Sequence, residues 1–211
     1  MTVVQTDAEK PRYHHGDLRA ALLHAAEVEL EENGIEAFSL RKVAKRAGVS
    51  HAAPAHHFGD VSGLLTALAV VGNRRFIACM AEAEIDATDA EDRLVCAGVG
   101  YTQFATRHHA LFRLIFASDK VDRSNQDLID AGRDAFMHMV DRVHALKGKH
   151  PMEDSAAMMD AMAIWSAAHG IADLFSSGRM IPVQSLDPEK QTQAIKSLMR
   201  RSIYADQAQS G

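Results

Sequence analysis

The chain has 211 residues, of which 47% are hydrophobic, a formal net charge of −5 and two cysteines. This length suffices for one or two domains with a sizeable core, while the polar N-terminal segment and the lack of a long apolar run argue against a signal peptide, a membrane span or a membrane partner. Cys79 and Cys96 are isolated and lack C-x-x-C spacing, which fits a reducing compartment and favours a cytoplasmic location.

Residues 1–11 are polar, and we expect them to form a disordered arm. Basic side chains gather at its end, namely Lys10, Arg12, His14 and His15. Such an arm can enter a DNA minor groove, and a simple flexible tail explains it equally well. Asp17 is a suitable N-cap for a first long helix over about 18–33, which ends at an Asn-Gly pair.

Residues 39–58 predict two short helices joined by a tight turn. Ser39 is a candidate N-cap for the first helix, and Gly48 can adopt the positive φ that ends it. Ser50 is a candidate cap for the second helix, although Pro54, one turn further on, removes a backbone hydrogen bond there. This pattern is typical of a helix-turn-helix, whose second helix lies in the major groove of DNA.

The charge of residues 39–58 supports the same interpretation. The segment contains no Asp or Glu, although the chain as a whole is acidic. Its cationic and titratable side chains are Arg41, Lys42, Lys45, Arg46, His51, His56 and His57. A basic island on an acidic protein is the expected footprint of phosphate contacts. A solvated helical hairpin that carries a few lysines is the alternative reading.

The sequence A-G-V-S, followed by a short helix ending in H-H-F and a long helix with Leu64, Leu65 and Ala67, resembles the DNA-binding domain of the tetracycline-repressor (TetR) family. The resemblance covers about residues 12–70. It implies a double-stranded DNA operator as partner, contacted by the second short helix and the helix before it. It implies that Arg41, His51, Ala52 and Ala53 lie near bases and that Ser39 and His57 lie near phosphates. With the neighbouring basic and capping residues of the segment, the expected DNA-binding residues are Ser39, Arg41, Lys42, Lys45, Ser50, His51, Ala52, Ala53, His56 and His57.

Two positions depart from the family pattern. Family members usually have Tyr at the position of Ala55 and Lys at the position of Val61, and both of those residues contact phosphate. The departures predict weaker DNA binding here, or phosphate contacts made elsewhere.

The rest of the chain has a helical period and no useful alternation of period 2, so the predicted fold class is all-α. We expect helices at about 61–85, 89–106, 108–117, 123–147, 154–177 and 187–205. The resemblance implies a helix-turn-helix DNA-binding domain over 12–60 and a helical ligand-binding and dimerisation domain over 61–211, with the first of these helices connecting them.

Trp165 and the pair His169-Gly170 resemble the W-x-x-x-H-G motif of one class of TetR-type C-terminal domain. Residues four apart share a helix face, and Gly170 would let another helix approach closely. The motif is therefore either a structural helix crossing or the place where His169 offers a polar group to a ligand pocket.

Aromatic and methionine side chains surround this motif in the expected helices. At helical spacing they are more often core than pocket, but methionine also suits adaptable binding surfaces. The expected ligand-binding residues are Phe104, Phe112, Phe136, Met137, Val140, Met158, Met162, Trp165 and His169. We expect a small apolar or amphipathic effector.

The last two long helices are expected to form a four-helix bundle with their copies in a homodimer. The candidate interface residues are Ile171, Leu174, Ile195, Leu198 and Met199. The chain has no catalytic constellation, no zinc-type Cys/His spacing and no phosphate loop, so we expect no enzyme activity, metal or cofactor. The sequence thus predicts a homodimeric, ligand-responsive transcriptional regulator, usually a repressor in this family, that binds a palindromic operator. The alternative is a helical small-molecule-binding or scaffold protein with weak or lost DNA binding.

Overall fold

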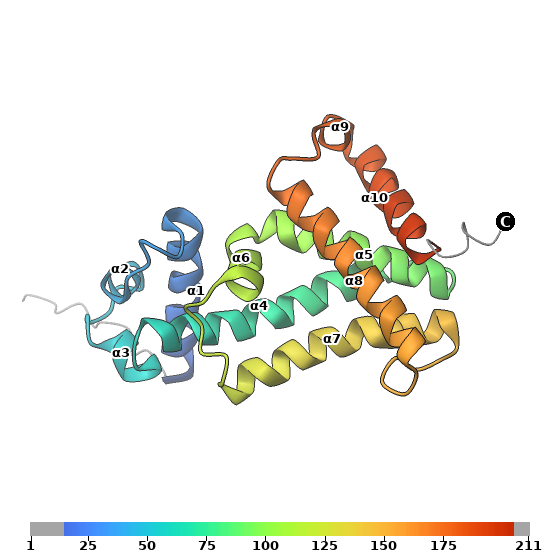
Figure 1. Cartoon of the computed structure of the whole chain (residues 1–211). Coiled ribbons are helices and arrows are strands. Elements are labelled where there is room, and N and C mark those ends of the chain that lie inside the picture. The colour runs from blue at the N-terminus through green and yellow to red at the C-terminus, as the bar shows by residue number, and fades with distance from the viewer. Residues whose placement is uncertain (1–14, 205–211) are drawn as a thin grey trace, which may run out of the picture.

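The computed structural model describes residues 15–204, with side chains from Leu18 onward, and this part of the chain is helical throughout (Figure 1). Its helices are α1 (His15–Asn33), α2 (Leu40–Arg46), α3 (Ala53–Phe58), α4 (Val61–Ala83), α5 (Ala90–Arg107), α6 (His109–Ala117), α7 (Gln126–Lys147), α8 (Ser155–Ser176), α9 (Ile181–Gln184) and α10 (Pro188–Ile203). The all-α prediction is confirmed. The predictions for the arm at 1–11 and for the side chains of residues 12–17 lie outside the described part.

Helices α1, α2 and α3 form a small unit at one end of the molecule, from which α4 runs along the larger C-terminal unit (Figure 1). Helix α4 packs against α5, α6 and α7, while α8 crosses α5 and α7. Helix α10 lies on α5 and α8. The C-terminal unit is therefore built in layers around α4 and α5.

Helix α4 is long and apolar enough to cross a bilayer by length and composition, so the expectation of no such run was wrong. However, 61% of its apolar window is buried inside the molecule. Residues such as Leu64, Leu65 and Leu68 are fully buried. The apolar character of α4 thus comes from its place in the core, because it meets neighbours on several sides.

Asp and Asn side chains fix where most of the long helices begin. In each case the side-chain oxygen accepts a hydrogen bond from the backbone N–H three residues on, satisfying a donor that the first helical turn leaves free. These caps are Asp60, Asp89, Asn125, Asp154 and Asp187. The expected helix starts near these positions agree with the structure to within three residues.

Gly100 sets the distance between α4 and α5. A Cβ at this position would lie 2.4 Å from the carbonyl oxygen of Cys79 and 2.6 Å from the Cα of Met80. Because these are backbone atoms, no side chain could move to make room. The close approach of α4 and α5 therefore requires glycine here, and it fixes one wall of the cavity described below.

One short helix is not predicted by the sequence. Helix α9 lies in the segment that follows Gly178, where the glycine and Pro182 indicate only a break between helices. Gly178 does end α8 with a positive φ of 76°, but Pro182 lies in the first turn of α9, where its missing N–H costs no helical hydrogen bond.

Candidate nucleic-acid interface and internal cavity

The turn between α2 and α3 has the geometry that the sequence predicts. Gly48 has a φ of 67°, and its N–H donates to the carbonyl of Lys45 at 3.2 Å. The N–H of Val49 then donates to the carbonyl of Ala44 at 3.0 Å. This is a glycine-ended helix C-terminus, and it turns the chain toward α3. Val43 and Ala44 form the buried face of α2.

The two serine caps do not form as expected. Ser39 occupies the N-cap position of α2 with extended backbone, but its hydroxyl accepts no capping hydrogen bond. Helix α3 begins at Ala53 rather than after Ser50, because residues 50–52 form a turn in which the Ser50 carbonyl accepts from the Ala53 N–H at 3.0 Å. Pro54 therefore lies in the first turn of α3, where its missing N–H costs nothing.

The four cations of α2 fall into two groups. Arg46 forms ion pairs with Glu29 and Glu32 of α1, and the Lys42 Nζ lies 3.3 Å from the Glu29 Oε1. Glu29 is only 2% exposed, so these two cations neutralise a buried carboxylate. Arg46 and Lys42 are thus tied to the small unit's own core.

Arg41 and Lys45 differ from them. Both are exposed, and among the described side chains, residues 18–204, no carboxylate lies within 4 Å of either. They are four residues apart and so share one face of α2. This face carries two cations free to meet an external anion.

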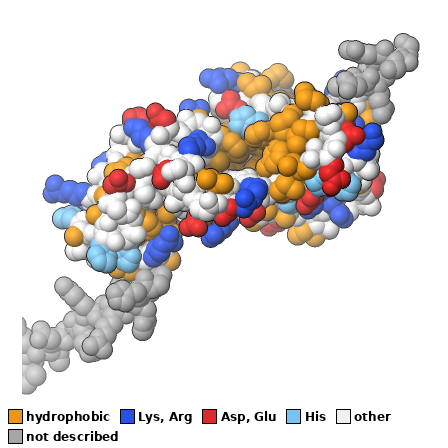
Figure 2. All heavy atoms as spheres, turned by 60° about the horizontal axis from the view of Figure 1, so that its bottom comes forward, with side chains coloured by type: hydrophobic (Ala, Val, Ile, Leu, Met, Phe, Trp, Pro, Cys, Tyr) orange, Lys and Arg blue, Asp and Glu red, His pale blue; other side chains and the backbone are white. Residues whose placement is uncertain are grey.

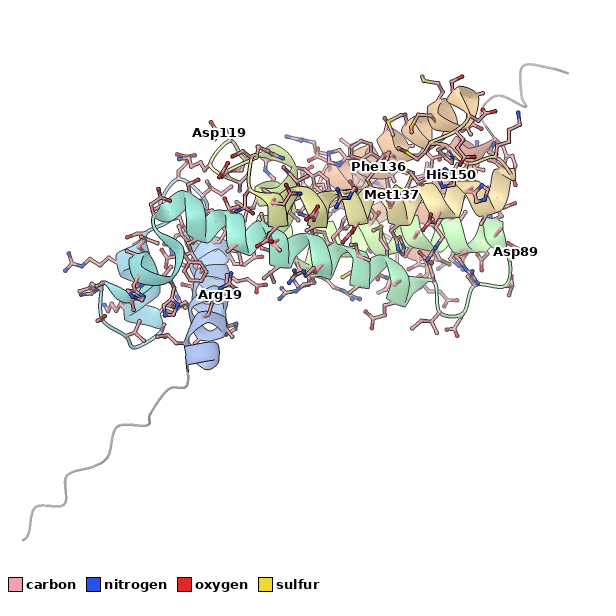
Figure 3. The ribbon with its side chains drawn as sticks, turned by 90° about the horizontal axis from the view of Figure 1, so that it is seen from below. Arg19, Asp89, Asp119, Phe136, Met137 and His150 are labelled. Carbon is pink, nitrogen blue, oxygen red and sulfur yellow. The ribbon has the colours of Figure 1, made fainter. Side chains whose placement is uncertain are left out.

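The surface of α3 continues this exposed region. His51, Ala52, Ala55 and His56 are exposed, and Ala53 and His57 are half-buried. Helix α3 is held in place by the buried Pro54 and by Phe58, whose ring lies 5.2 Å from the Arg19 guanidinium carbon. Figure 3 shows Arg19 on α1 within this unit. The DNA-binding residues predicted on α3 and its preceding turn thus lie at or near the surface, and none is fully buried.

Replacing the exposed Ala55 with Tyr is expected to tighten binding to DNA by about three- to tenfold. An added tyrosine hydroxyl can donate one further hydrogen bond to phosphate, a contact that contributes on the order of 1 kcal/mol. Equilibrium titration of matched and scrambled duplexes checks this, and both should tighten alike because phosphate contacts carry no sequence information. Ala55→Phe is the control. Unchanged affinity for Ala55→Tyr would show that this position does not face the backbone.

Polar contacts join the small unit to the rest of the chain. Arg75 of α4 donates to the Glu27 carboxylate of α1, with one of the two bonds at 3.2 Å. At a second point, the Lys120 Nζ lies 2.7 Å from Glu36 Oε2. Lys120 belongs to the connection between α6 and α7, residues 118–125. The α1–α3 unit is therefore held to the larger unit through both α4 and this α6–α7 connection.

The C-terminal unit contains a partly open cavity of about 280 Å³. It is lined by Asn73, Phe76, Met80, Leu94, Ala97, Gly98, Tyr101, Ile115, Phe116, Arg123, Leu128, Gly132, Ala135, Phe136, His138, Met139, Ile164, Trp165, Ala168 and Met199. The lining is mainly apolar, with a few polar groups placed within it. Figure 2 shows hydrophobic side chains gathered around a hollow on this part of the molecule. These are the features of a site for a small organic molecule.

A tyrosine and a histidine form the central polar contact of the cavity wall. The Tyr101 hydroxyl lies 2.8 Å from the His169 Nδ1. Burial raises the pKa of Tyr101 and lowers the pKa of His169. Both groups are therefore neutral near pH 7, and each can satisfy the other without leaving a buried charge.

A second polar cluster lies where the C-terminal end of α4 meets α7. The Glu84 carboxylate is within 2.7 Å of both the His138 Nε2 and the Arg142 Nε. Burial acts to raise the pKa of Glu84, but the hydrogen bonds from His138 and Arg142 outweigh it and hold this pKa below its ordinary value. The Glu84 charge is thus neutralised within the protein. Among the side chains described, those of residues 18–204, no group of three His, Cys, Asp or Glu residues is placed to hold a metal ion.

The structure brings only part of the predicted ligand-binding set to the cavity. Phe136 and Trp165 line it, with ring centroids 6.2 Å apart. Figure 3 shows Phe136 on α7 together with the neighbouring Met137. His169 lies just behind the lining, with Phe112 stacked on its ring at 5.4 Å.

The remaining predicted ligand residues do not line the cavity. Phe104 and Val140 are fully buried and act as core residues between helices. Met137, Met158 and Met162 are half-buried on faces that the cavity does not reach. Helical spacing alone does not distinguish a core face from a cavity face, which is why the sequence pattern includes these five. Tyr101, Arg123 and Asn73 line the cavity and were not predicted.

The predicted dimer residues also divide. Ile195 and Met199 are 5% and 1% exposed within the single chain, so they are not available to a partner. Met199 packs on Gly98 and lines the cavity instead. Leu174 is 44% exposed, and Ile171 and Leu198 are half-buried.

Gly170 does not bring another helix of this chain close to α8. A Cβ added at this position would meet no atom within 4 Å. The expected close helix approach is thus absent from the described chain, and Gly170 leaves open space on α8.

Two family descriptions match this sequence. Residues 22–68 match the bacterial regulatory proteins of the tetR family, and residues 94–199 match the tetracyclin repressor-like C-terminal domain. No curated protein matches the chain.

Solved structures are similar over almost the full length. A protein with unknown function from Rhodococcus sp. RHA1 is 31% identical, with a TM-score of 0.73 over 90% of this chain and 98% of that one. A TetR-like transcriptional regulator from the same organism is 17% identical, with a TM-score of 0.64 over 92% and 100%. The TetR family regulator PfmR from Thermus thermophilus is 17% identical, with a TM-score of 0.60 over 86% and 96%. The last two likenesses show a shared fold.

Proposed function

This chain belongs to the TetR family of transcriptional regulators, and we propose that it binds a palindromic operator as a homodimer and leaves it when a small effector fills the cavity. Regulators of this family are not enzymes, and we place this one in the cytoplasm, where its DNA is. The single observation that carries DNA binding is the pair Arg41 and Lys45. They are exposed cations without an internal partner in the described part of the chain, on a helix-turn-helix whose other two cations are neutralised.

The proposed dimer follows from the outer face of α8. The buried residues of α8 recur at helical spacing and face the core. The opposite face carries a stripe of small and apolar residues without a charge, namely Met159, Ala163, Ser166, Gly170 and Leu174. A helix face of this kind can pack closely on its copy across a two-fold axis. Leu198 of α10 would border the same interface.

The proposed regulation follows from the position of the cavity. The cavity wall includes α4, which continues directly from the α1–α3 unit, and the α6–α7 connection, which contacts that unit through Lys120 and Glu36. An effector that prefers one arrangement of these elements shifts the spacing of the two recognition helices. Coupling energies between such sites are typically about 1–3 kcal/mol. We propose that the Tyr101–His169 pair is the polar contact point of this effector site.

Selection of bound sites from random DNA duplexes tests the proposal. We expect a sequence with two-fold symmetry, bound by two chains, with half-sites about one helical turn apart. Affinity should fall steeply with rising salt because phosphate contacts release counterions. An unsymmetric pool with weak, salt-independent binding would favour the alternative of a helical ligand-binding or scaffold protein. The departures from the family pattern at Ala55 and Val61 are the observations that support this alternative.

A further inference from the structure

The charge of the cavity lining is one-sided. No Asp or Glu of the described residues lines the cavity, although the chain has more acidic than basic side chains overall. Two lining residues can carry positive charge, Arg123 and His138. His138 is already bonded to Glu84, whereas Arg123 has no carboxylate within 4 Å in the described part of the chain. The lining thus carries one unpaired cation.

The geometry of Arg123 leaves part of its guanidinium free. Its Nη2 donates to the carbonyl oxygens of Ile115 and Ser118, at 3.3 and 3.0 Å. These carbonyls lie at the C-terminal end of α6, so they hold the guanidinium in place. The Nε and Nη1 groups donate to none of the groups that the structure describes, whose side chains begin at Leu18. A fixed guanidinium with free N–H groups is suited to a carboxylate, which it can bind through two parallel hydrogen bonds.

Arg123 lies at the opposite end of the cavity from His138, the other lining residue that can carry a positive charge. Arg123 and Leu128 lie at one end of its α7 wall and Met139 at the other. Met139 comes eleven residues after Leu128, or about 16 Å along the helix. Toward the Met139 end the lining includes Met80, Leu94 and Met199. Because Arg123 is itself exposed, it lies at the rim, with aromatic and aliphatic side chains further in.

We propose that the cavity binds a small monocarboxylate whose carboxylate pairs with Arg123 and whose apolar body lies among the aromatic and methionine side chains. This inference rests on the proposed function, because it names the chemical class of the effector. A cavity of about 280 Å³ lies at the small end of the roughly 300–1,000 Å³ range of small-molecule sites, so it suits a small ligand. The rim position of Arg123 leaves the carboxylate partly hydrated, which limits its desolvation cost.

The same carboxylate contact also connects the cavity to the α1–α3 unit. Arg123 belongs to the α6–α7 connection, in which the Asp122 N–H donates to the Thr66 Oγ1 of α4 at 2.8 Å. Lys120 of this connection pairs with Glu36 between α1 and α2. A ligand that binds Arg123 therefore acts on a segment that contacts both α4 and the helix-turn-helix unit. The charge of the ligand, and not only its size, therefore affects the position of the DNA-binding unit.

Intrinsic fluorescence provides a direct test, because Trp165 is the only tryptophan of the chain and lines the cavity. The full-length protein is titrated at pH 7.5 with two matched pairs, octanoate against octan-1-ol and 3-phenylpropionate against 3-phenylpropan-1-ol. We expect at least one acid to bind at least about tenfold more tightly than its alcohol, since charge-assisted hydrogen bonds are roughly twice as strong as neutral ones. Arg123→Gln should lose this preference while it keeps its affinity for the alcohol.

Arg113→Gln is the matched control, because Arg113 is an exposed arginine on α6 that does not line the cavity. It should keep the preference for the acid, and Arg123→Lys, which keeps the charge but not the planar fork, should keep part of it. Equal binding of acid and alcohol by the unaltered protein overturns the inference but leaves the cavity as an effector site. If none of the four compounds changes the fluorescence or the DNA affinity, while specific DNA binding persists, both the inference and the effector role of this cavity are wrong.

Discussion

Reversing both free cations of α2, as Arg41→Glu and Lys45→Glu, is expected to weaken operator binding at least about 100-fold, since each charge-assisted hydrogen bond contributes about 1.5–3 kcal/mol. Each side chain is exposed and lacks a carboxylate partner among the side chains that the structure describes, from Leu18 to Tyr204. Their charges are therefore available to phosphate. A gel-shift or anisotropy titration at several salt concentrations measures the change. The slope of log affinity against log salt should also become shallower, because fewer counterions are released.

The control for this experiment reverses two cations elsewhere, as Arg93→Glu and Lys149→Glu. Each double variant changes the net charge of the chain by the same amount. Arg93 and Lys149 lie on α5 and after α7, outside the α1–α3 unit. Only the α2 variant should lose specific binding, and both should keep the helical circular dichroism spectrum. Equal losses would mean that the effect comes from overall charge, and undiminished binding would show that α2 does not face DNA.

Lys42 and Arg46 provide no equivalent test, although the sequence groups them with Arg41 and Lys45. Both cations lie beside the buried carboxylate of Glu29. Reversing either would place like charges together in a site with little water, so the small unit would be destabilised. Any loss of DNA binding would then follow from unfolding.

The helix-turn-helix was predictable because its signals are local. Gly48 can end α2 through its own backbone conformation, without any contact to a distant residue, and it has the expected positive φ. The prediction that Ser39 and Ser50 cap helices was less reliable. At both positions the backbone conformation, and not the serine hydroxyl, determines where the helix begins. A turn over residues 50–52 also satisfies the polar groups near Ser50, and Pro54 then starts α3 without loss.

The cavity was less predictable because it depends on where side chains from six helices meet. Helical spacing identifies Phe104 and Val140 as inward-facing, but not whether they meet another side chain or an empty space. Arg123 lies in a connection rather than a periodic helix, so no pattern marks it. Its role follows only from the fold, which brings residues 115, 118 and 123 together.

The outer stripe of α8 shows the same limit at the level of assembly. The sequence suggested Ile195 and Met199 as interface residues because they lie on an apolar face of α10. That face is used within the chain, against α5 and α8. The apolar surface that stays uncovered within the chain is on α8. A Cβ at Gly170 would meet no neighbouring atom, and Leu174 is partly exposed. The proposed interface is therefore best tested at Leu174.

Leu174→Arg is expected to convert the proposed dimer to a monomer, with at least about a 100-fold rise in the dimer dissociation constant, because an unpaired charge buried in an interface costs about 3–5 kcal/mol. In the single chain Leu174 is 44% exposed, so the arginine can reach water there and the fold is kept. Analytical ultracentrifugation measures the change.

Ile85→Arg, at a 75% exposed position after α4, is the control and should remain dimeric. Since a palindrome requires two linked recognition helices, the Leu174→Arg variant should also lose most of its operator affinity while its α2 cations are intact. A variant that stays dimeric would place the interface elsewhere, and a monomer that binds the full operator as tightly as before would refute the link between assembly and DNA recognition.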